Sequence, residues 1–316
     1  MKYKNFSAIL ISISSSLALV ACGGSGAGFA KPTLPFSSFP AIKADQTIVA
    51  EGISQAATVT LDTDTDLVID VSPAILDSDT TEVTLGFDSV KDLNTLTVES
   101  ASANLSWTES SGDTFLNSGV GLFISSDAFF ISNPDSSQTF VLADPADPSL
   151  NWNYQTFGVW QDTSVSGTTI TNHRGVASLG RVSPVSGIPT SGSATYTGLA
   201  SGFFSDINGN PHLFDSTLSA QASFSARSIS FTTSATTTIN ENTLNITSEP
   251  GLNLSGNLFY NSGSNQFSGS LSTANGYLDG TATGRFYGSN AEEIGGTFDL
   301  RGSASESMLG GFGAKR

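Results

Sequence analysis

Apolar and polar residues alternate with a period of two through much of the second half of the chain. From Leu218 to Ala226 every second residue is Leu, Ala or Phe, and Ser and Gln occupy the positions between them. The same alternation returns in three further stretches, Leu278–Phe286, Phe298–Leu300 and Met308–Ala314. Because successive side chains of a strand point to opposite faces of its sheet, this pattern predicts half-buried β-strands. The phase shifts between Ala226 and Ile229, which predicts a turn or a bulge near Arg227-Ser228.

The predicted strands continue to the last residues of the chain, and their apolar face mixes Gly and Ala with Leu and Phe. An open sheet would leave edge strands that need covering, so a run of strands of this kind favours closure into a barrel. Alternating large and small side chains also suit a narrow barrel interior. The opposite face carries Ser, Thr, Gln and Arg, where a membrane barrel would carry an apolar band. We therefore expect a soluble barrel in the second half.

The first half of the chain shows the same period in shorter pieces. Val83, Leu85 and Phe87 fall on one face, as do Val59 and Leu61, and residues typical of turns separate the pieces. Charged residues make up only 13% of the chain and Gly numbers 32, a composition that favours strands and turns over helices. The sequence therefore predicts an all-β protein with a strand-rich N-terminal domain.

The charge of the chain is strongly negative and unevenly distributed. The formal net charge is -16, from 12 basic and 28 acidic residues, which excludes nucleic acid and anionic lipid headgroups as favoured partners. Residues 44–148 hold 18 acidic residues and one basic residue, whereas residues 149–316 hold 10 acidic and seven basic residues. This difference predicts a domain boundary close to Asn151.

An aromatic-rich segment lies at that predicted boundary. It contains four large aromatic residues, Trp152, Tyr154, Phe157 and Trp160. Trp and Tyr are enriched at the centres of protein interfaces, so Trp152, Tyr154 and Trp160 are candidates for contacting a partner. Packing at the junction between the two halves is the alternative that we favour.

The N-terminus has the features of an export signal. Lys2 and Lys4 precede an apolar run from Ala8 to Val20, which is too short to span a bilayer comfortably. The residues around the junction, Leu19-Val20-Ala21-Cys22-Gly23, resemble the bacterial lipoprotein box, in which Cys22 would be lipidated after removal of residues 1–21. An ordinary signal with an incidental cysteine is the alternative. Residues 22–45 are rich in Gly, Ser and Pro, which predicts a flexible tether.

Residue patterns that support catalysis or metal binding are absent from the sequence. The single cysteine excludes a disulfide framework, and neither a nucleophile elbow, a phosphate-binding loop nor zinc-ligand spacing occurs. Asp62, Asp64 and Asp66 alternate as calcium ligands can, but an EF-hand needs Gly and Glu where Leu67 and Pro73 stand. A solvated turn is the favoured interpretation, and a calcium site of another kind stays open. We expect no enzyme activity and no resident cofactor or metal.

Three segments, in order along the chain, carry a resemblance to a known family. Residues 284–298 read Gly-Arg-Phe-Tyr-Gly-Ser-Asn-Ala-Glu-Glu-Ile-Gly-Gly-Thr-Phe and resemble the barrel signature of transferrin-binding protein B and its relatives, with Ser289 where proline is usual. Residues 310–316, Gly-Gly-Phe-Gly-Ala-Lys-Arg, are similar to that family's closing strand, and residues 188–198 are similar to its first barrel strand.

The resemblance implies a fold and a cellular location. It implies a strand-rich handle domain, expected at residues 46–162, followed by an eight-stranded antiparallel barrel at residues 163–316. It also implies an outer-membrane lipoprotein displayed on the cell surface, which captures a protein or small-solute ligand and works beside a TonB-dependent receptor and a surface-export translocon. Within the signature, we expect Glu293 to accept hydrogen bonds from loop amides rather than to act in catalysis.

Two other functions are consistent with the sequence. Among single-lobe relatives, hemophilins bind haem, and His173 or His212 would be its axial ligand if an apolar pocket lay beside either side chain. An exposed loop histidine is the favoured interpretation for each. A structural or adhesive envelope protein without a captured ligand is the other alternative.

Overall fold

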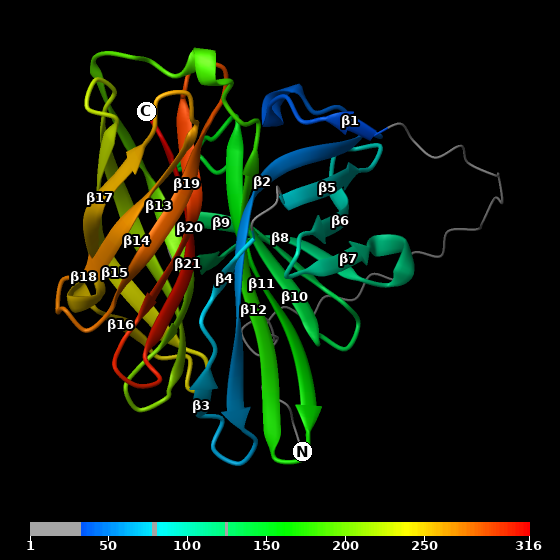
Figure 1. The fold of residues 1–316 in the computed structure, drawn as a ribbon. Helices are drawn as coiled ribbons and strands as arrows, with labels where there is room; N and C mark the ends of the chain where they lie inside the picture. Colours follow the sequence, from blue (N-terminus) through cyan, green and yellow to red (C-terminus); the bar gives the residue numbers. More distant parts are fainter. Residues whose placement is uncertain (1–32, 78–80, 124–125) are drawn as a thin grey trace.

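The computed structural model describes residues 33–77, 81–123 and 126–316, and Cys22 and the export signal lie outside this part. Two β-sheets account for the architecture (Figure 1), which confirms the expected all-β class. Within the described ranges the helical elements are single 3₁₀ turns: η2 (Phe39–Ala41), η3 (Glu109–Ser111), η4 (Val185–Gly187) and η5 (Pro250–Leu252). None of them is long and apolar enough to cross a membrane.

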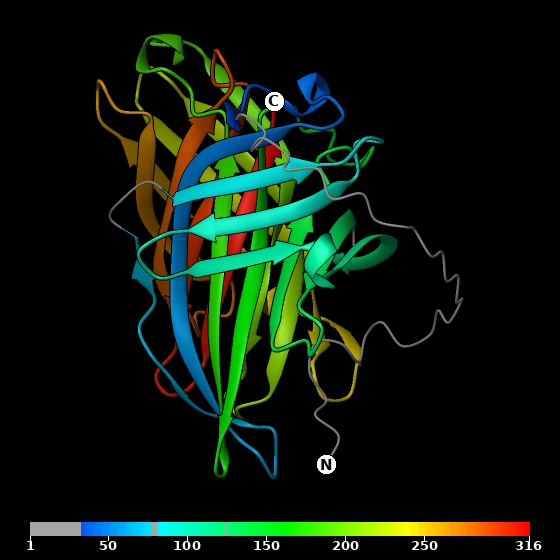
Figure 2. The same cartoon turned by 90° about the vertical axis from the view of Figure 1, so that its right-hand side faces the viewer.

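The first sheet, here called the handle sheet, is built around one long strand. Its strands are β1 (Thr33–Pro35), β2 (Thr47–Asp62), β3 (Val68–Val71), β4 (Ile75–Leu76), β5 (Thr81–Phe87), β6 (Leu93–Glu99), β7 (Asn104–Thr108), β8 (Thr114–Phe123), β9 (Ser126–Ser132), β10 (Gln138–Ala143), β11 (Gln155–Ser166) and β12 (Thr169–Gly180). The order is β7-β6-β5-β2-β12-β11-β10-β9-β8, and β1, β3 and β4 also pair with β2. Figure 2 shows β5, β6 and β7 crossing in front of the long strands β2, β12 and β11.

This crossing buries both faces of β11. Phe157 and Val159 pack in the cluster that faces the barrel, while Trp160 packs with Trp107 and Phe140 in the cluster beneath the crossing strands. A strand that is covered on both sides reads as a continuous apolar run rather than an alternating one. This explains why the alternation of apolar and polar residues is weaker in β11 than in the barrel strands.

The second sheet closes into a barrel of eight strands. They are β13 (Ser193–Ser205), β14 (Pro211–Ser223), β15 (Ser228–Asn240), β17 (Leu254–Tyr260), β18 (Gln266–Thr273), β19 (Asp279–Tyr287), β20 (Glu293–Arg301) and β21 (Ser307–Lys315), with the short β16 (Ile246–Ser248) paired to the edge of β15. Pairing of β13 with both β14 and β21 joins the ends of the chain of strands, so closure is confirmed. The predicted turn near Arg227-Ser228 is also confirmed, because β14 ends at Ser223 and β15 begins at Ser228.

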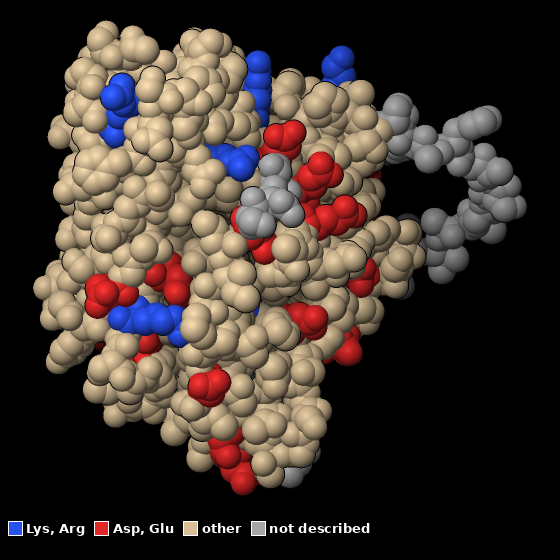
Figure 3. Space-filling model, viewed as in Figure 1, with Lys and Arg blue, Asp and Glu red and all other residues tan. Residues whose placement is uncertain are grey.

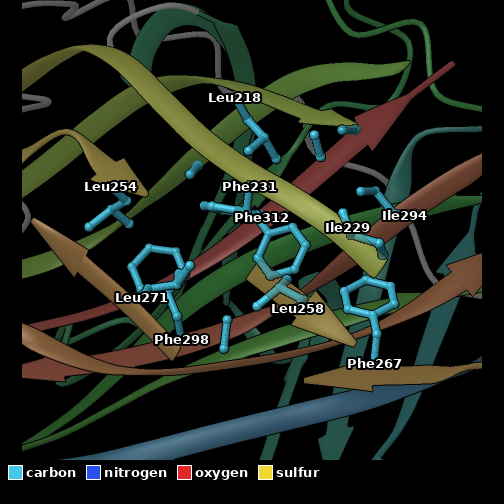
Figure 4. Packing of buried hydrophobic residues seen from close by; sticks show 14 of the residues in the cluster. Leu218, Ile229, Phe231, Leu254, Leu258, Phe267, Leu271, Ile294, Phe298 and Phe312 are labelled. Carbon is cyan, nitrogen blue, oxygen red and sulfur yellow. The ribbon is translucent and has the colours of Figure 1, made fainter. Parts of the chain in front are cut away.

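The barrel interior is filled by aromatic and aliphatic side chains (Figure 4). Phe231 meets Phe312 edge-on at 5.1 Å, and Phe214 lies 5.9 Å from Phe298. A Cβ on Gly310 would lie within 3 Å of both the Phe298 and the Phe214 ring. The predicted interleaving of large and small residues is therefore what makes room for the rings.

The barrel packs closely on the handle sheet through the outward face of β20 and β21. A Cβ on Gly311 would lie 2.6 Å from Phe157 Cδ2 and from Val176 Cγ1, and one on Gly295 would lie 2.7 Å from Ser178 Oγ. Gly295 and Gly311 therefore permit the close approach of the two sheets. Leu309, which lies two residues before Gly311 and on the same face of β21, completes the apolar contact with the handle.

The limits of the handle sheet differ from the expected residues 46–162. β12 pairs with β11 and β2 along its whole length, so the sheet extends to Gly180 and the barrel strands begin at Ser193. At the other end, β1 and η2 pack on the sheet and bury Phe36 and Ile42, within the expected tether. Figure 3 shows most of the acidic side chains of this face on the handle side, with a smaller group at the lower end of the barrel. The charge difference thus agrees with the division into two parts, but it does not detect a hairpin that crosses the boundary.

Candidate ligand-binding site

An apolar cavity of about 230 Å³ opens on the handle, at the end of the long strands where β2 begins. We call it the handle pocket. Its lining comes from four separate segments and consists of Phe39, Pro40, Ile42, Leu85, Phe87, Lys91, Leu93, Phe129, Leu142, Asp144, Pro145 and Ala146. Lys91 and Asp144 are the charged side chains in this lining. A mostly apolar cavity with a few polar groups is the usual form of a binding site for a small molecule or for one side chain of a partner.

The N-terminal segment forms one wall of the pocket. Pro40 occupies the first turn of η2, where its missing N–H is no loss, and the Phe39 N–H donates to the Asn153 carbonyl at 2.9 Å. The Phe36 and Phe39 rings lie 4.7 Å apart. Phe36 is buried while Phe39 stays partly exposed, so one ring anchors the segment and the other faces the cavity.

The opposite wall is a loop shaped by aspartate side chains. Asp144 Oδ1 accepts the Ala146 N–H at 2.8 Å, and Asp147 accepts the N–H groups of Asp127 and Ser149, each at 2.6 Å. Burial raises the pKa of Asp144, and the carboxylates of Asp127 and Asp147 raise it further, against the hydrogen bond from Ala146. The pocket therefore presents a buried carboxyl group that ionises less readily than an exposed one.

Lys91 lies at the rim, in the turn between β5 and β6. It adopts a left-handed backbone conformation with φ of 74°, and Asp88 holds the turn by accepting the N–H groups of Val90 and Asp92. The pocket thus combines apolar walls with the Asp144 carboxyl group, whose pKa is raised, and the Lys91 ammonium group at its rim. This combination suits a ligand group that is mostly apolar and carries a small polar end. The arrangement contains no nucleophile with an adjacent base, and among the described residues no group of three or more His, Cys, Asp or Glu side chains is arranged to hold a metal ion.

The three candidate aromatics do not form one surface. Trp152 and Trp160 are each only 2% exposed. Trp152 packs among residues of both sheets, including Leu309, and Trp160 lies on the other side of the handle sheet. Tyr154 is partly exposed and its N–H donates to Glu293. The two tryptophans are thus placed as core residues, and neither offers a face to a partner in this structure.

The two histidines lie in different sheets. His173 is exposed on β12, where its Nδ1 lies 3.2 Å from Thr58 Oγ1. His212 is mostly buried on β14 and lines a cavity of about 200 Å³ together with the carboxylates of Asp206, Glu249 and Glu306. Haem needs a larger cavity than this one, and the three carboxylates would repel its anionic propionates. Neither environment is the apolar haem pocket that the sequence analysis required.

Two further sequence expectations concern carboxylates. Glu293 accepts the N–H groups of Asn153, Tyr154 and Gln155 at 2.7, 2.8 and 2.9 Å, which confirms its expected role with loop amides. Asp62 Oδ1 accepts the N–H groups of Asp64 and Thr65 at the end of β2. The Asp62 carboxylate therefore organises the turn, as the favoured interpretation of this run expected.

The residues of the handle pocket are absent from the sequence-based candidates. One signal does point to the N-terminal wall: Phe36, Phe39 and Ile42 lie within a stretch rich in Gly, Ser and Pro. Flexible tethers are poor in such large apolar residues, so their presence indicates that this part of the stretch packs on the protein. The remaining walls come together only through the pairing of distant strands.

The fold is an all-β lobe, in which a handle sheet packs on a filled eight-stranded barrel. Residues 188–316 match the family model described as the C-lobe and N-lobe β-barrels of Tf-binding protein B. The barrel part of this chain is therefore similar to the barrels of transferrin-binding protein B. No curated protein matches the chain in sequence.

Solved structures of three transferrin-binding proteins B are similar to this chain. A variant from Actinobacillus pleuropneumoniae H49 is 15% identical, covering 84% of this chain and 99% of that chain, with a TM-score of 0.41. A variant from Haemophilus parasuis Hp5 is 12% identical, covering 85% and 76%, with a TM-score of 0.39. The isotype 1 protein from serogroup B Neisseria meningitidis is 14% identical, covering 90% and 78%, with a TM-score of 0.31.

Proposed function

We propose that the protein is a non-catalytic lipoprotein of the bacterial surface that captures a ligand through the handle pocket. The observation that carries the proposal is the pocket itself, an open apolar cavity with one rim ammonium and one buried carboxyl group. The ligand is a partner protein that inserts an apolar side chain, or a small solute of the same chemistry. An iron-carrier protein such as transferrin is the first partner to test, because the family is named for binding it.

Filling the pocket tests this proposal without removing any core residue. Ala146 is exposed and lines the cavity, so Ala146→Trp places an indole across it. Ala101 is exposed in the turn between β6 and β7 and does not line the pocket, so Ala101→Trp is the matched control. Both variants should keep the melting temperature of the wild type within a few degrees.

Capture is measured by incubating the immobilised protein with serum or spent medium and identifying retained partners by mass spectrometry. A partner retained by the wild type and by Ala101→Trp, but lost by Ala146→Trp, supports the proposal. Equal retention by all three proteins would show that recognition lies elsewhere on the surface.

The anchor and the delivery step are separate parts of the proposal. We propose lipidation at Cys22, which Cys22→Ser should abolish, releasing the protein from the outer-membrane fraction. Recovery of the wild type in the cytoplasm would contradict surface anchoring. We also propose that the captured ligand passes to a TonB-dependent receptor, which should co-purify with the native lipoprotein in the presence of ligand.

A further inference from the structure

A second cavity, of about 310 Å³, opens at the end of the barrel where the chain terminates. We call it the barrel pocket. Three segments form it: the linker around η4, the turn between β14 and β15, and the turn between β17 and β18. Its residues belong neither to the handle pocket nor to the contact between barrel and handle.

The barrel pocket is positive in a chain that is strongly negative. Arg227 is the charged side chain in its lining, and the lining contains no Asp or Glu. Within the described part of the chain, the Arg227 guanidinium has no hydrogen bond and no ion pair. A guanidinium carries five donors in a planar fork that matches a carboxylate, so this group is available to an anion.

A buried tyrosine hydroxyl in the same lining also lacks a partner. Tyr260 is 8% exposed, and its ring is held edge-on against Phe286 at 5.1 Å. Its hydroxyl oxygen is buried and makes no hydrogen bond to any described residue. Buried polar groups are nearly always hydrogen-bonded, so an unpaired hydroxyl calls for an acceptor that the protein itself does not provide. Burial raises the pKa of Tyr260, with Arg227 opposing, so the hydroxyl stays protonated as a donor.

One wall of the pocket is apolar, and the turn between β17 and β18 adds the neutral polar residues Asn261, Ser262 and Ser264. Phe224 and Ile188 are buried in the apolar wall, and Val185 is exposed at the edge. One cation and one hydroxyl donor balance a single negative charge, whereas a phosphate dianion would need more positive charge than the lining provides. The volume lies at the lower end of the range for small-molecule sites.

We propose that the barrel pocket binds a small organic monocarboxylate, with the carboxylate on Arg227 and the Tyr260 hydroxyl and the apolar body against Phe224 and Ile188. This site is separate from the proposed capture at the handle pocket, so either site can fail its test without the other.

The backbone at Arg227 provides a clean variant. Its φ is 51°, a left-handed conformation that is strained for a residue with a side chain and readily adopted by glycine. Arg227→Gly therefore removes the guanidinium while relieving strain in the turn, and the variant should fold at least as stably as the wild type. Tyr260→Phe removes the hydroxyl and keeps the ring. Lys43→Ala, at an exposed residue outside both pockets, removes one positive charge as a control.

The probe is 4-fluorobenzoate, followed by ¹⁹F NMR as it is titrated with the purified protein. The wild type and Lys43→Ala should broaden its signal, and the neutral analogue 4-fluorobenzamide should stay sharp. Arg227→Gly should weaken binding about tenfold or more, and Tyr260→Phe about fivefold, in line with the loss of charge-assisted hydrogen bonds. No broadening with the wild type, equal binding of the amide, tighter binding of phenylphosphonate, or unchanged binding by both variants would each overturn the proposal.

Discussion

Replacing Glu293 by alanine tests the contact that fixes the start of β11 on the barrel. The carboxylate accepts three backbone N–H groups, from Asn153, Tyr154 and Gln155, and Glu293 itself is buried. A hydrogen bond to a charged group contributes about 1.5–3 kcal/mol, and a buried N–H left without an acceptor costs about 1–3 kcal/mol. Gln155 is fully buried whereas Asn153 and Tyr154 are partly exposed, so water replaces part of the loss at two of the three groups. We expect Glu293→Ala to lower the free energy of unfolding by about 3 kcal/mol.

Urea unfolding followed by tryptophan fluorescence measures this loss, because Trp152 is buried directly beside the loop. With a slope of about 3 kcal/mol per molar urea, the midpoint should fall by about 1 M. Glu293→Gln keeps the size of the side chain but turns an N–H₂ group toward N–H donors, so it should lose about 2 kcal/mol.

The neighbouring residue provides the control for this prediction. Glu292 accepts hydrogen bonds from Asn290 within its own turn, so Glu292→Ala should cost less than about 1 kcal/mol. If Glu293→Ala unfolded within 0.5 kcal/mol of the wild type, or no further from it than Glu292→Ala, Glu293 would not be what holds the loop, and our account of the signature would be wrong.

Three further predictions concern the handle and its contact with the barrel. Because burial holds the pKa of Asp144 above its usual range, the native state keeps a proton that the unfolded chain has released, and stability falls as the pH rises from the ordinary Asp value to the raised one. Asp144→Asn should therefore be more stable than the wild type at pH 7. Its free energy of unfolding, measured by urea melts at a series of pH values, should also depend less on pH, and an unchanged pH dependence would contradict this. Gly311→Ala should destabilise by about 1–3 kcal/mol in thermal melts, because its Cβ would lie 2.6 Å from Phe157 and Val176. Glu241→Ala should lower the free energy of unfolding by about 2–4 kcal/mol, because it leaves the guanidinium of Arg174, a residue only 3% exposed, without the carboxylate that now lies 2.8 Å away. A loss below 1 kcal/mol would show that the hydrogen bond to Gln161 alone satisfies this arginine.

The sequence predicted the barrel well because its strands bury one face each. The alternation from Leu218 to Ala226 predicts an inward apolar row, and four of its five apolar members lie in the barrel core, while Ala226 is exposed in the turn after β14. Small residues on the inward rows of other strands, such as Gly310 on β21, then follow from the space that the rings need. These are local signals, and the closure of the sheet follows from the number of strands and the lack of edge protection.

The handle could be predicted only in class, because its structure depends on long-range pairing. β2 pairs with β12 across more than a hundred residues of sequence, and the local sequence of either strand does not predict this register. The change in charge predicts a boundary close to Asn151, but a charge difference is a property of surfaces, and the β11–β12 hairpin that follows Asn151 is largely interior. The handle pocket shares this difficulty, since its walls come from Phe39, Leu85, Phe129 and Asp144 on separate elements.

The residues that carry the family resemblance have a common physical role. Glu293 holds the loop before β11, Gly295 and Gly311 allow the handle sheet to approach, and the rings of Phe298 and Phe312 fill the barrel. The signature therefore specifies how a handle sheet docks on a barrel. The handle pocket lies outside the three segments that carry the resemblance, and the barrel pocket takes only Ile188, Pro189 and Thr190 from them. Proteins that share these segments can therefore differ in most of the residues of both pockets. Recognition in this chain has to be argued from its own pockets, and a change of ligand between relatives requires no change in the residues that identify the fold.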